Sequence, residues 1–153
     1  CWTFLRAPSP RAMWARRQAH ETAIHRVDAE LAAGLARSPF TADFAADGAD
    51  ELLTCFVPRR STSLRAESPT TLGLACTDAD ASWTLRIDAD GVTTTTGPLG
   101  EKAGGKEAAC TVRGAAADLF LALWNRPGAE ALSIEGDRAV LDLFGEAVQV
   151  RWA

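Results

Sequence analysis

The stretch TLGLACTDADASWTLRIDADGVTTTTG, residues 71–97, alternates apolar and polar side chains with a period of two. This period is typical of β-strands with one buried face. Turn-forming residues interrupt the pattern at Asp78–Ala81 and again at Asp90–Gly91. The four consecutive threonines are β-branched and favour a strand over a linker. The stretch therefore predicts consecutive strands joined by short turns.

The residues that follow predict strands mixed with helices. ACTVRG (109–114) predicts a strand, and AAADLFLALWNRPG (115–128) predicts a helix that ends at Pro127 and Gly128. The last three segments are predicted to be a short strand in ALSIEGD (131–137), a helical turn or two in RAVLDLF (138–144), and a closing strand in EAVQVRW (146–152).

Two helices are predicted before this module. Ser9 and Pro10 suit the start of the first helix, and Gly34 suits its end. The second is expected from about Thr41 to Val57, where Pro58 stops it. Its buried stripe is predicted to be Phe44, Leu52, Leu53 and Phe56, and its exposed acids Asp47, Asp50 and Glu51.

This order of elements predicts an α+β fold. We expect residues 1–60 to form helices of a bundle, residues 61–70 to form a polar linker, and residues 71–153 to form a small α+β domain.

Composition excludes several classes of partner. The net charge of −4 argues against binding to nucleic acid, which requires clustered Lys and Arg side chains. No apolar run approaches the roughly 18 to 20 residues needed to span a bilayer, so no membrane partner is expected. The four cysteines, Cys1, Cys55, Cys76 and Cys110, contain no CxxC pair and are predicted to be free thiols of a cytoplasmic protein.

Both histidines of the chain lie in RRQAHETAIHRVDAE, residues 16–30. Glu21 and His25 are four apart in a predicted helix, so they share a face and could bind one divalent metal ion such as zinc. The same spacing also occurs in ordinary helix-stabilising pairs. His20 points about 100° away from Glu21 around the helix and is expected to be exposed. Asp28 could hydrogen-bond the free ring nitrogen of His25 or remain a solvated acid.

The run RRQAHETAIHRVDAELAAG (16–34) resembles the mycothiol-dependent maleylpyruvate isomerase family of actinobacteria. That family joins a DinB-like metal-binding helical bundle to a small α+β domain of sterol-carrier-like type. Three further segments are similar to the family in the same order: FAADGADELLTCFVPRR (44–60), ADLFLALWNRPG (117–128) and LSIEGDRAVLDLF (132–144).

The resemblance implies that Glu21 and His25 are metal ligands, with Asp28 in the second shell. It also implies a metal-dependent isomerase or thiol-transferase-like enzyme that uses mycothiol as a cofactor and acts on a small electrophilic substrate. In the family the third ligand is a His from an earlier helix. Because this sequence begins at Cys1 without a Met, we expect that N-terminal helices are missing, or that a partner supplies them.

Three arginines are candidates for binding an anionic group of the cofactor or substrate, namely Arg17, Arg126 and Arg138. Each could equally be a surface or helix-capping residue. The alternative function is a non-catalytic small-ligand-binding or interaction module, in which the α+β half offers an apolar pocket.

Overall fold

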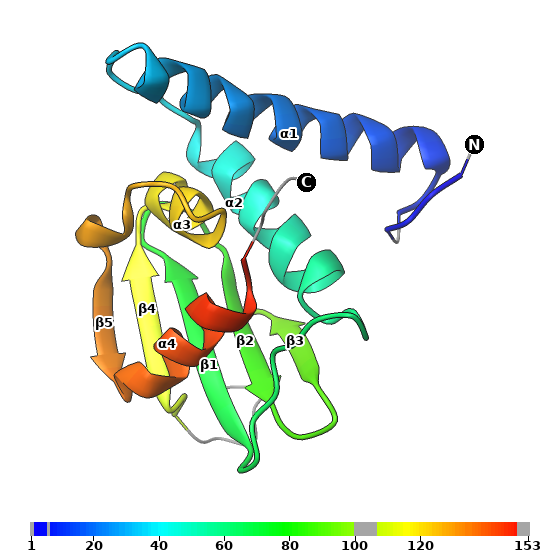
Figure 1. The fold of residues 1–153 in the computed structure, drawn as a ribbon, viewed down its shortest axis with the longest axis vertical. Helices are drawn as coiled ribbons and strands as arrows, with labels where there is room; N and C mark the ends of the chain where they lie inside the picture. Colours follow the sequence, from blue (N-terminus) through cyan, green and yellow to red (C-terminus); the bar gives the residue numbers. More distant parts are fainter. Residues whose placement is uncertain (1, 6, 100–106, 150–153) are drawn as a thin grey trace. The chain divides into compact units, whose positions relative to one another are not determined.

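The computed structural model describes residues 2–5, 7–99 and 107–149 (Figure 1). The chain divides into two compact units, Cys1–Phe40 and Thr41–Ala153. The sequence predicts that the helical part ends near residue 60. In the structure, the division between the two compact units lies between Phe40 and Thr41. The assignment of residues 1–60 to a DinB-like bundle stays a prediction. Within the described ranges, no helix combines the length and apolar character needed to cross a bilayer.

The first unit is built on one long helix, α1 (Pro10–Ala32). The Ser9 side chain caps it by accepting a hydrogen bond from the Ala12 amide at 3.1 Å, and Pro10 occupies its first turn. Gly34 follows the helix with a φ of 67°, a conformation that glycine adopts without strain. The predicted start and stop of this helix are confirmed.

The second unit contains one five-stranded sheet in the order β3-β2-β1-β4-β5 (Figure 1). Its strands are Thr70–Cys76 (β1), Ser82–Ile87 (β2), Val92–Thr96 (β3), Cys110–Gly114 (β4) and Ser133–Gly136 (β5). Strands β1 and β4 pair in parallel, and every other neighbouring pair is antiparallel. The β2–β3 turn is held by Asp88, whose Oδ1 accepts hydrogen bonds from the Asp90 and Gly91 amides. The α+β prediction is confirmed.

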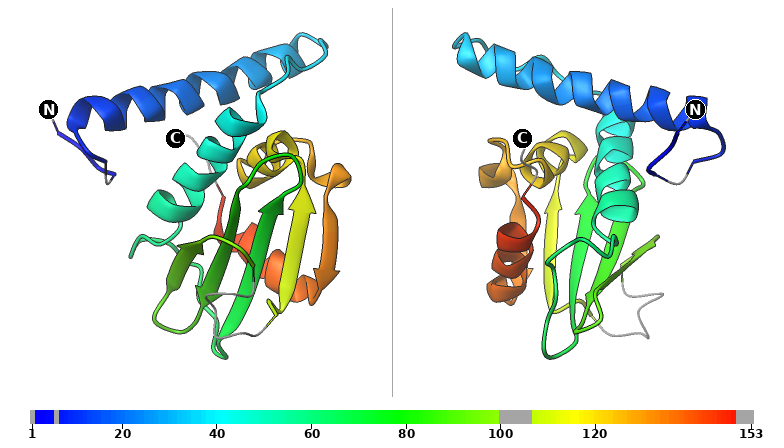
Figure 2. Two further views of the ribbon diagram at one scale, coloured as in Figure 1. Left: turned by 180° about the vertical axis from the view of Figure 1, so that it is seen from behind. Right: turned by 45° about the vertical axis from the view of Figure 1, so that its right-hand side comes forward.

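One face of the sheet is apolar, and helices cover it. Leu74 of β1 lies between its neighbours Trp83 of β2 and Val112 of β4, and all three side chains are buried. Helix α4 (Arg138–Ala147) packs against β1 and β4 on this face (Figure 2). The sheet residues that point the other way are mostly polar, as the period of two predicted.

Helix α2 (Ala42–Asp50) continues directly into a π-helical segment, η1 (Glu51–Phe56). The π geometry is visible in the Val57 amide, which donates to the Leu52 carbonyl at 2.9 Å, an i→i+5 bond. The expected exposure of Glu51 is wrong, because its exposed fraction is 1%. Glu51 lies seven residues after Phe44 and so falls on the same helix face, and the expectation failed because an acidic residue was assumed to avoid that face.

Helix α2 packs closely against helix α3 (Ala116–Leu123). The rings of Phe44 and Phe120 meet edge to face, with centroids 6.3 Å apart. Gly48 lies directly under the Phe120 ring, and a Cβ atom at this position would overlap the ring. The close approach of the two helices therefore requires a residue without a side chain at position 48.

The predicted closing strand over residues 146–152 is wrong for the part that the structure describes. Glu146 and Ala147 belong to α4, which is longer than the predicted turn or two, and Val148 follows as its C-cap. Val140, Phe144 and Val148 recur every four residues and are buried, which is the pattern of a helix rather than a strand. Residues 150–152 of the predicted strand lie outside the described residues.

Gly48→Ala is expected to lower the free energy of unfolding by about 1–3 kcal/mol, because the methyl group overpacks the contact with Phe120. Gly145→Ala is the matched control in α4, since a Cβ there meets nothing within 4 Å. It should raise stability by about 0.5–1 kcal/mol through helix propensity. Urea unfolding followed by tryptophan fluorescence measures both. A Gly48→Ala variant as stable as the wild type would contradict this packing.

Candidate functional site

Four charged or titratable side chains form a row along α1. Arg17 donates to one oxygen of Glu21, with Nε at 2.8 Å and Nη2 at 2.5 Å from Oε2. The other oxygen of Glu21, Oε1, lies 3.6 Å from His25 Nε2. On the far side of the ring, His25 Nδ1 lies 3.3 Å from Asp28 Oδ2. The spacing of four, four and three residues places all of them on one side of the helix.

Side-chain exposure increases from Arg17 to His25. The side chain of Arg17 is 3% exposed and that of Glu21 19%, whereas His25 is 52% exposed. A charged group held by a buried partner has little rotamer freedom, so Arg17 restrains the orientation of Glu21. His25 is open to solvent beside this restrained carboxylate, and an ion could reach it.

The donor pair fits a divalent metal ion in chemistry and in spacing. Zinc accepts imidazole nitrogen and carboxylate oxygen at about 2.0–2.2 Å, so two ligands of a tetrahedral ion lie roughly 3.4 Å apart. The observed separation of Nε2 and Oε1 is 3.6 Å. Oε2 of Glu21 faces Arg17, and Nδ1 of His25 faces Asp28. Such contacts behind the donor atoms are usual around metal ligands.

Among the residues that the structure describes, no group of three or more His, Cys, Asp or Glu side chains could hold a metal ion. Glu21 and His25 therefore form at most two ligands of such a site. Asp28 faces the opposite nitrogen of the His25 ring, and its role behind a metal ligand stays a prediction.

His20 does not have the expected exposure. Its exposed fraction is 1%, and it belongs to the buried stripe of α1. The buried residues of this helix are Met13, Arg17, His20, Ile24 and Val27, spaced alternately by four and three. This spacing is that of one continuous helix face. The expectation failed because a polar residue was assumed to avoid that face.

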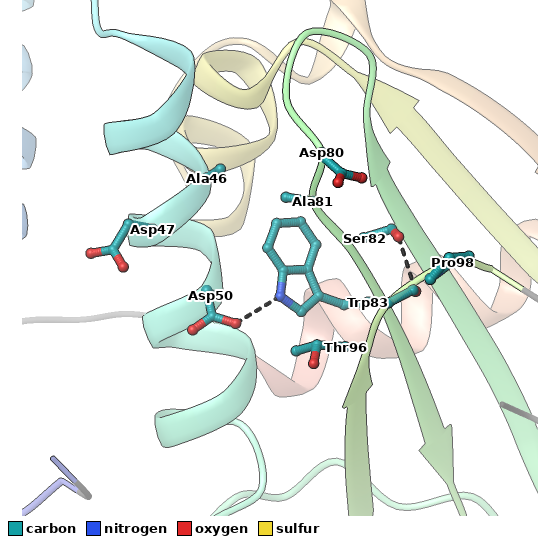
Figure 3. Close-up of a pocket in the computed structure, with 10 residues that line it drawn as sticks. Ala46, Asp47, Asp50, Asp80, Ala81, Ser82, Trp83, Thr96 and Pro98 are labelled. Carbon is teal, nitrogen blue, oxygen red and sulfur yellow. Dashed lines mark hydrogen bonds between the residues drawn. The ribbon is translucent and has the colours of Figure 1, made fainter. Parts of the chain in front are cut away.

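A cavity of about 560 Å³ lies between α2 and the β2–β3 edge of the sheet (Figure 3). Asp47, Asp50 and Asp80 contribute to its lining, together with Trp83. Asp50 Oδ1 accepts a hydrogen bond from Trp83 Nε1 at 2.9 Å, so this carboxylate connects α2 to the sheet. The role of Asp50 is thus at least partly structural, and nothing in the local sequence around it indicates the partner.

A second cavity of about 530 Å³ lies between α4, α3 and the sheet. Its wall is mostly apolar and includes Leu74, Val112, Ile134 and Phe144. The apolar pocket expected in the α+β half is therefore present.

The comparison with family models finds the MDMPI C-terminal domain over residues 43–143. This match covers more than half of the 153 residues. The chain belongs to the MDMPI C-terminal domain family. The resemblance to the maleylpyruvate isomerases is thereby confirmed. The matched range begins after α1, so it does not include Glu21 or His25.

Solved structures are similar to part of this chain at low identity. The sec-alkylsulfatase Pisa1 from Pseudomonas sp. is 21% identical, with a TM-score of 0.50, and covers 74% of this chain. The chain spans only 17% of that protein. A ubiquinone synthesis protein described as UbiJ-SCP2 is 24% identical, with a TM-score of 0.42, over 72% of this chain and 93% of its own. The comparison with curated proteins finds no match.

Within the family domain, the structure places Arg126 and Arg138 at helix ends. Arg126 follows α3 and donates from Nη1 to the Trp124 carbonyl at 2.6 Å, which is a capping contact. Arg138 is the exposed first residue of α4, directly after the N-cap Asp137. Arg17 instead lies on α1 and holds Glu21. Their predicted role in binding an anionic ligand stays a prediction.

Cys76 and Cys110 of the family domain are not activated nucleophiles. Burial, and secondarily the charge of Asp78, raise the pKa of the Cys76 thiol to about 11. Burial is also the main cause of the raised pKa of Cys110. Both groups are therefore protonated near neutral pH, whereas nucleophilic cysteines require a lowered pKa.

Asp50→Ala is expected to lower the free energy of unfolding by about 1–3 kcal/mol, because it leaves the buried Trp83 indole N–H without its acceptor. Asp50→Asn keeps an acceptor oxygen and should restore most of the loss. Asp80→Ala, in the exposed part of the same cavity lining, serves as the control and should stay within about 0.5 kcal/mol of the wild type. Equal urea midpoints for Asp50→Ala and Asp80→Ala would show that the bond is not structural.

Proposed function

We propose that this chain is the C-terminal part of a metal-dependent enzyme that uses mycothiol in an isomerase or thiol-transferase-like reaction. The observation that carries the proposal is the row on α1. Nε2 of His25 and Oε1 of Glu21 lie 3.6 Å apart, and the other donor atom of each side chain faces a protein partner. Membership of the MDMPI C-terminal domain family supports the same proposal.

Each residue of the row has a distinct role in the proposal. Glu21 and His25 hold the metal ion, which we propose to be zinc because one ligand is an imidazole. Arg17 occupies Oε2 of Glu21 and keeps Oε1 turned toward His25. Asp28 faces Nδ1 of His25, and a proton held there leaves the Nε2 lone pair on the side of Glu21.

The chemistry that such an ion supplies is Lewis acidity, which lowers the pKa of a thiol or water bound to it. The proposed substrate is a small electrophile, and mycothiol is the attacking thiol. Arg126, Arg138 and Arg17 are the side chains we propose for anionic groups of these molecules. Helices that precede this sequence, or a partner chain, are proposed to supply the remaining ligand.

We propose the cytoplasm as the site of action. Cys55, Cys76 and Cys110 are free thiols, and such thiols persist in a reducing compartment. A thiol cofactor requires the same conditions.

The apolar cavity of the α+β unit favours a second candidate function, a small-ligand-binding module. A volume of about 530 Å³ falls in the range of small-molecule sites. A measurement of mycothiol-dependent substrate turnover separates the two candidate functions. The enzyme should show such turnover, whereas a binding module should show none.

The two histidines make the metal proposal directly measurable. In a zinc titration followed by NMR of the imidazole side chains, the His25 resonances should shift, whereas those of the buried His20 should not. Glu21→Gln should weaken the zinc affinity by at least about tenfold, because a neutral amide is a poorer ligand than a carboxylate.

Glu30→Gln is the matched control, because Glu30 lies on the same helix but bonds to Ser38 instead of His25. It should leave the zinc response of His25 unchanged. If zinc does not perturb His25 at any concentration, or perturbs it equally in Glu21→Gln, this helix does not bind the metal.

A further inference from the structure

Strand β3 forms one edge of the five-stranded sheet, and its only neighbour in the described part of the chain is β2 (Figure 1). The residues on either side of β3 bond to that neighbour. The Asp88 amide donates to the Gly91 carbonyl at 2.9 Å, and the Gly97 amide donates to the Ser82 carbonyl at 3.0 Å. These two bonds fix which backbone groups of β3 point toward β2.

The outer side of β3 presents unused backbone groups. In an antiparallel ladder every second residue bonds to the same neighbour, so Thr93 and Thr95 bond to β2 as Gly91 and Gly97 do. The amides and carbonyls of Val92, Thr94 and Thr96 consequently point away from the sheet. Within the described ranges, these outward backbone groups make no hydrogen bond.

Strand β3 lacks the features that usually prevent an edge strand from pairing with another chain. Such features include charged side chains, proline and bulges. The sequence VTTTT has no charge and no proline, and it pairs with β2 residue by residue without a bulge. The opposite edge, β5, has only four residues, carries Glu135 and ends at Gly136 with a φ of 92°. Of the two edges, β3 is therefore the one suited to pairing.

The outer side of β3 is complementary to itself. When two copies are placed antiparallel about a two-fold axis at Thr94, this residue faces Thr94 of the second copy. Val92 then faces Thr96 of the second copy, so each outward amide meets a carbonyl. Because residues 92–96 carry no charge, two copies meet there without like-charge repulsion.

The side chains of Thr93 and Thr95 fit the same pairing. Both are exposed, and they lie on the sheet face opposite to Thr94, whose hydroxyl donates to the Leu53 carbonyl on the helix-covered face. In the two-fold arrangement Thr93 lies directly opposite Thr95 of the second copy. Cross-strand pairs of threonine are favourable.

We propose that β3 is a dimer interface, through which two copies of this chain join their sheets into one. An uncharged edge offers no charge that would select an acidic or a basic partner, whereas its own two-fold arrangement uses every outward backbone group. Each chain has one such edge, so the association closes at the dimer. The inference depends neither on metal binding by α1 nor on the apolar cavity.

Analytical ultracentrifugation of the intact chain at increasing concentration tests the association. A reversible monomer–dimer equilibrium without larger species is expected. In amide hydrogen exchange, the protection of Val92, Thr94 and Thr96 should rise with protein concentration, because their amides become bonded in the dimer. The amides of the other edge, Ser133–Gly136, should show no such rise.

A charge exchange tests the register of the pairing. The double variant Thr93→Lys/Thr95→Lys places two like-charge pairs across the interface, as does Thr93→Glu/Thr95→Glu, and each should weaken dimerisation by about tenfold. An equimolar mixture of the two variants should regain association as a mixed dimer, since every Lys then faces a Glu. Ser133→Lys, at the exposed opposite edge, is the control and should dimerise like the wild type.

Three results would overturn the proposal. The first is a chain that stays monomeric at every concentration, which would assign this edge to a different partner. The second is an open series of larger assemblies. The third is a pair of folded charge variants that dimerise like the wild type or fail to associate when mixed. None of these results bears on the zinc response of His25, so this inference and the metal proposal fail separately.

Discussion

The contact of Gly48 with the Phe120 ring sets the distance between α2 and α3, and the rest of the second unit depends on it. With α2 at this distance, Asp50 reaches the indole of Trp83 on β2, and the Leu53 carbonyl accepts a hydrogen bond from the Thr94 hydroxyl on β3 at 2.7 Å. One helix is thereby fastened to a second helix and to two strands. The helix from Ala42 onward is consequently part of the sheet-containing unit, in agreement with a family match that begins at residue 43.

The candidate site on α1 combines a restrained group with an accessible one. On α1, the buried Arg17 fixes one oxygen of Glu21 while His25 remains half exposed beside the other oxygen. A preorganised charge therefore lies where a ligand can reach it, which lowers the cost of ordering the site upon binding.

The features that the sequence predicts well are local. Ser9, Pro10 and Gly34 mark the ends of α1, because capping depends on neighbouring residues, and the alternation in 71–97 reports the period of the strands directly. The bond between Asp50 and Trp83 joins residues 33 apart, so no local pattern contains it. No local sequence pattern contains the parallel pairing of β1 with β4 either. Nor does one contain the set of residues that line the cavity beside α2 or the cavity under α4. The prediction of a closing strand failed because the composition of EAVQ suits a helix as well as a strand. The buried face that begins with Val140 and Phe144 continues the helix into this segment.

Amide hydrogen exchange of the intact chain tests most directly whether α2 is an integral part of the sheet-containing unit. The buried amides of α2 (Ala42–Asp50) should exchange with the same opening free energy as those of β1 and β2, since all of them require unfolding of one cooperative unit. Exchange of the α2 amides at a distinctly lower free energy, while β1 and β2 stay protected, would contradict the account.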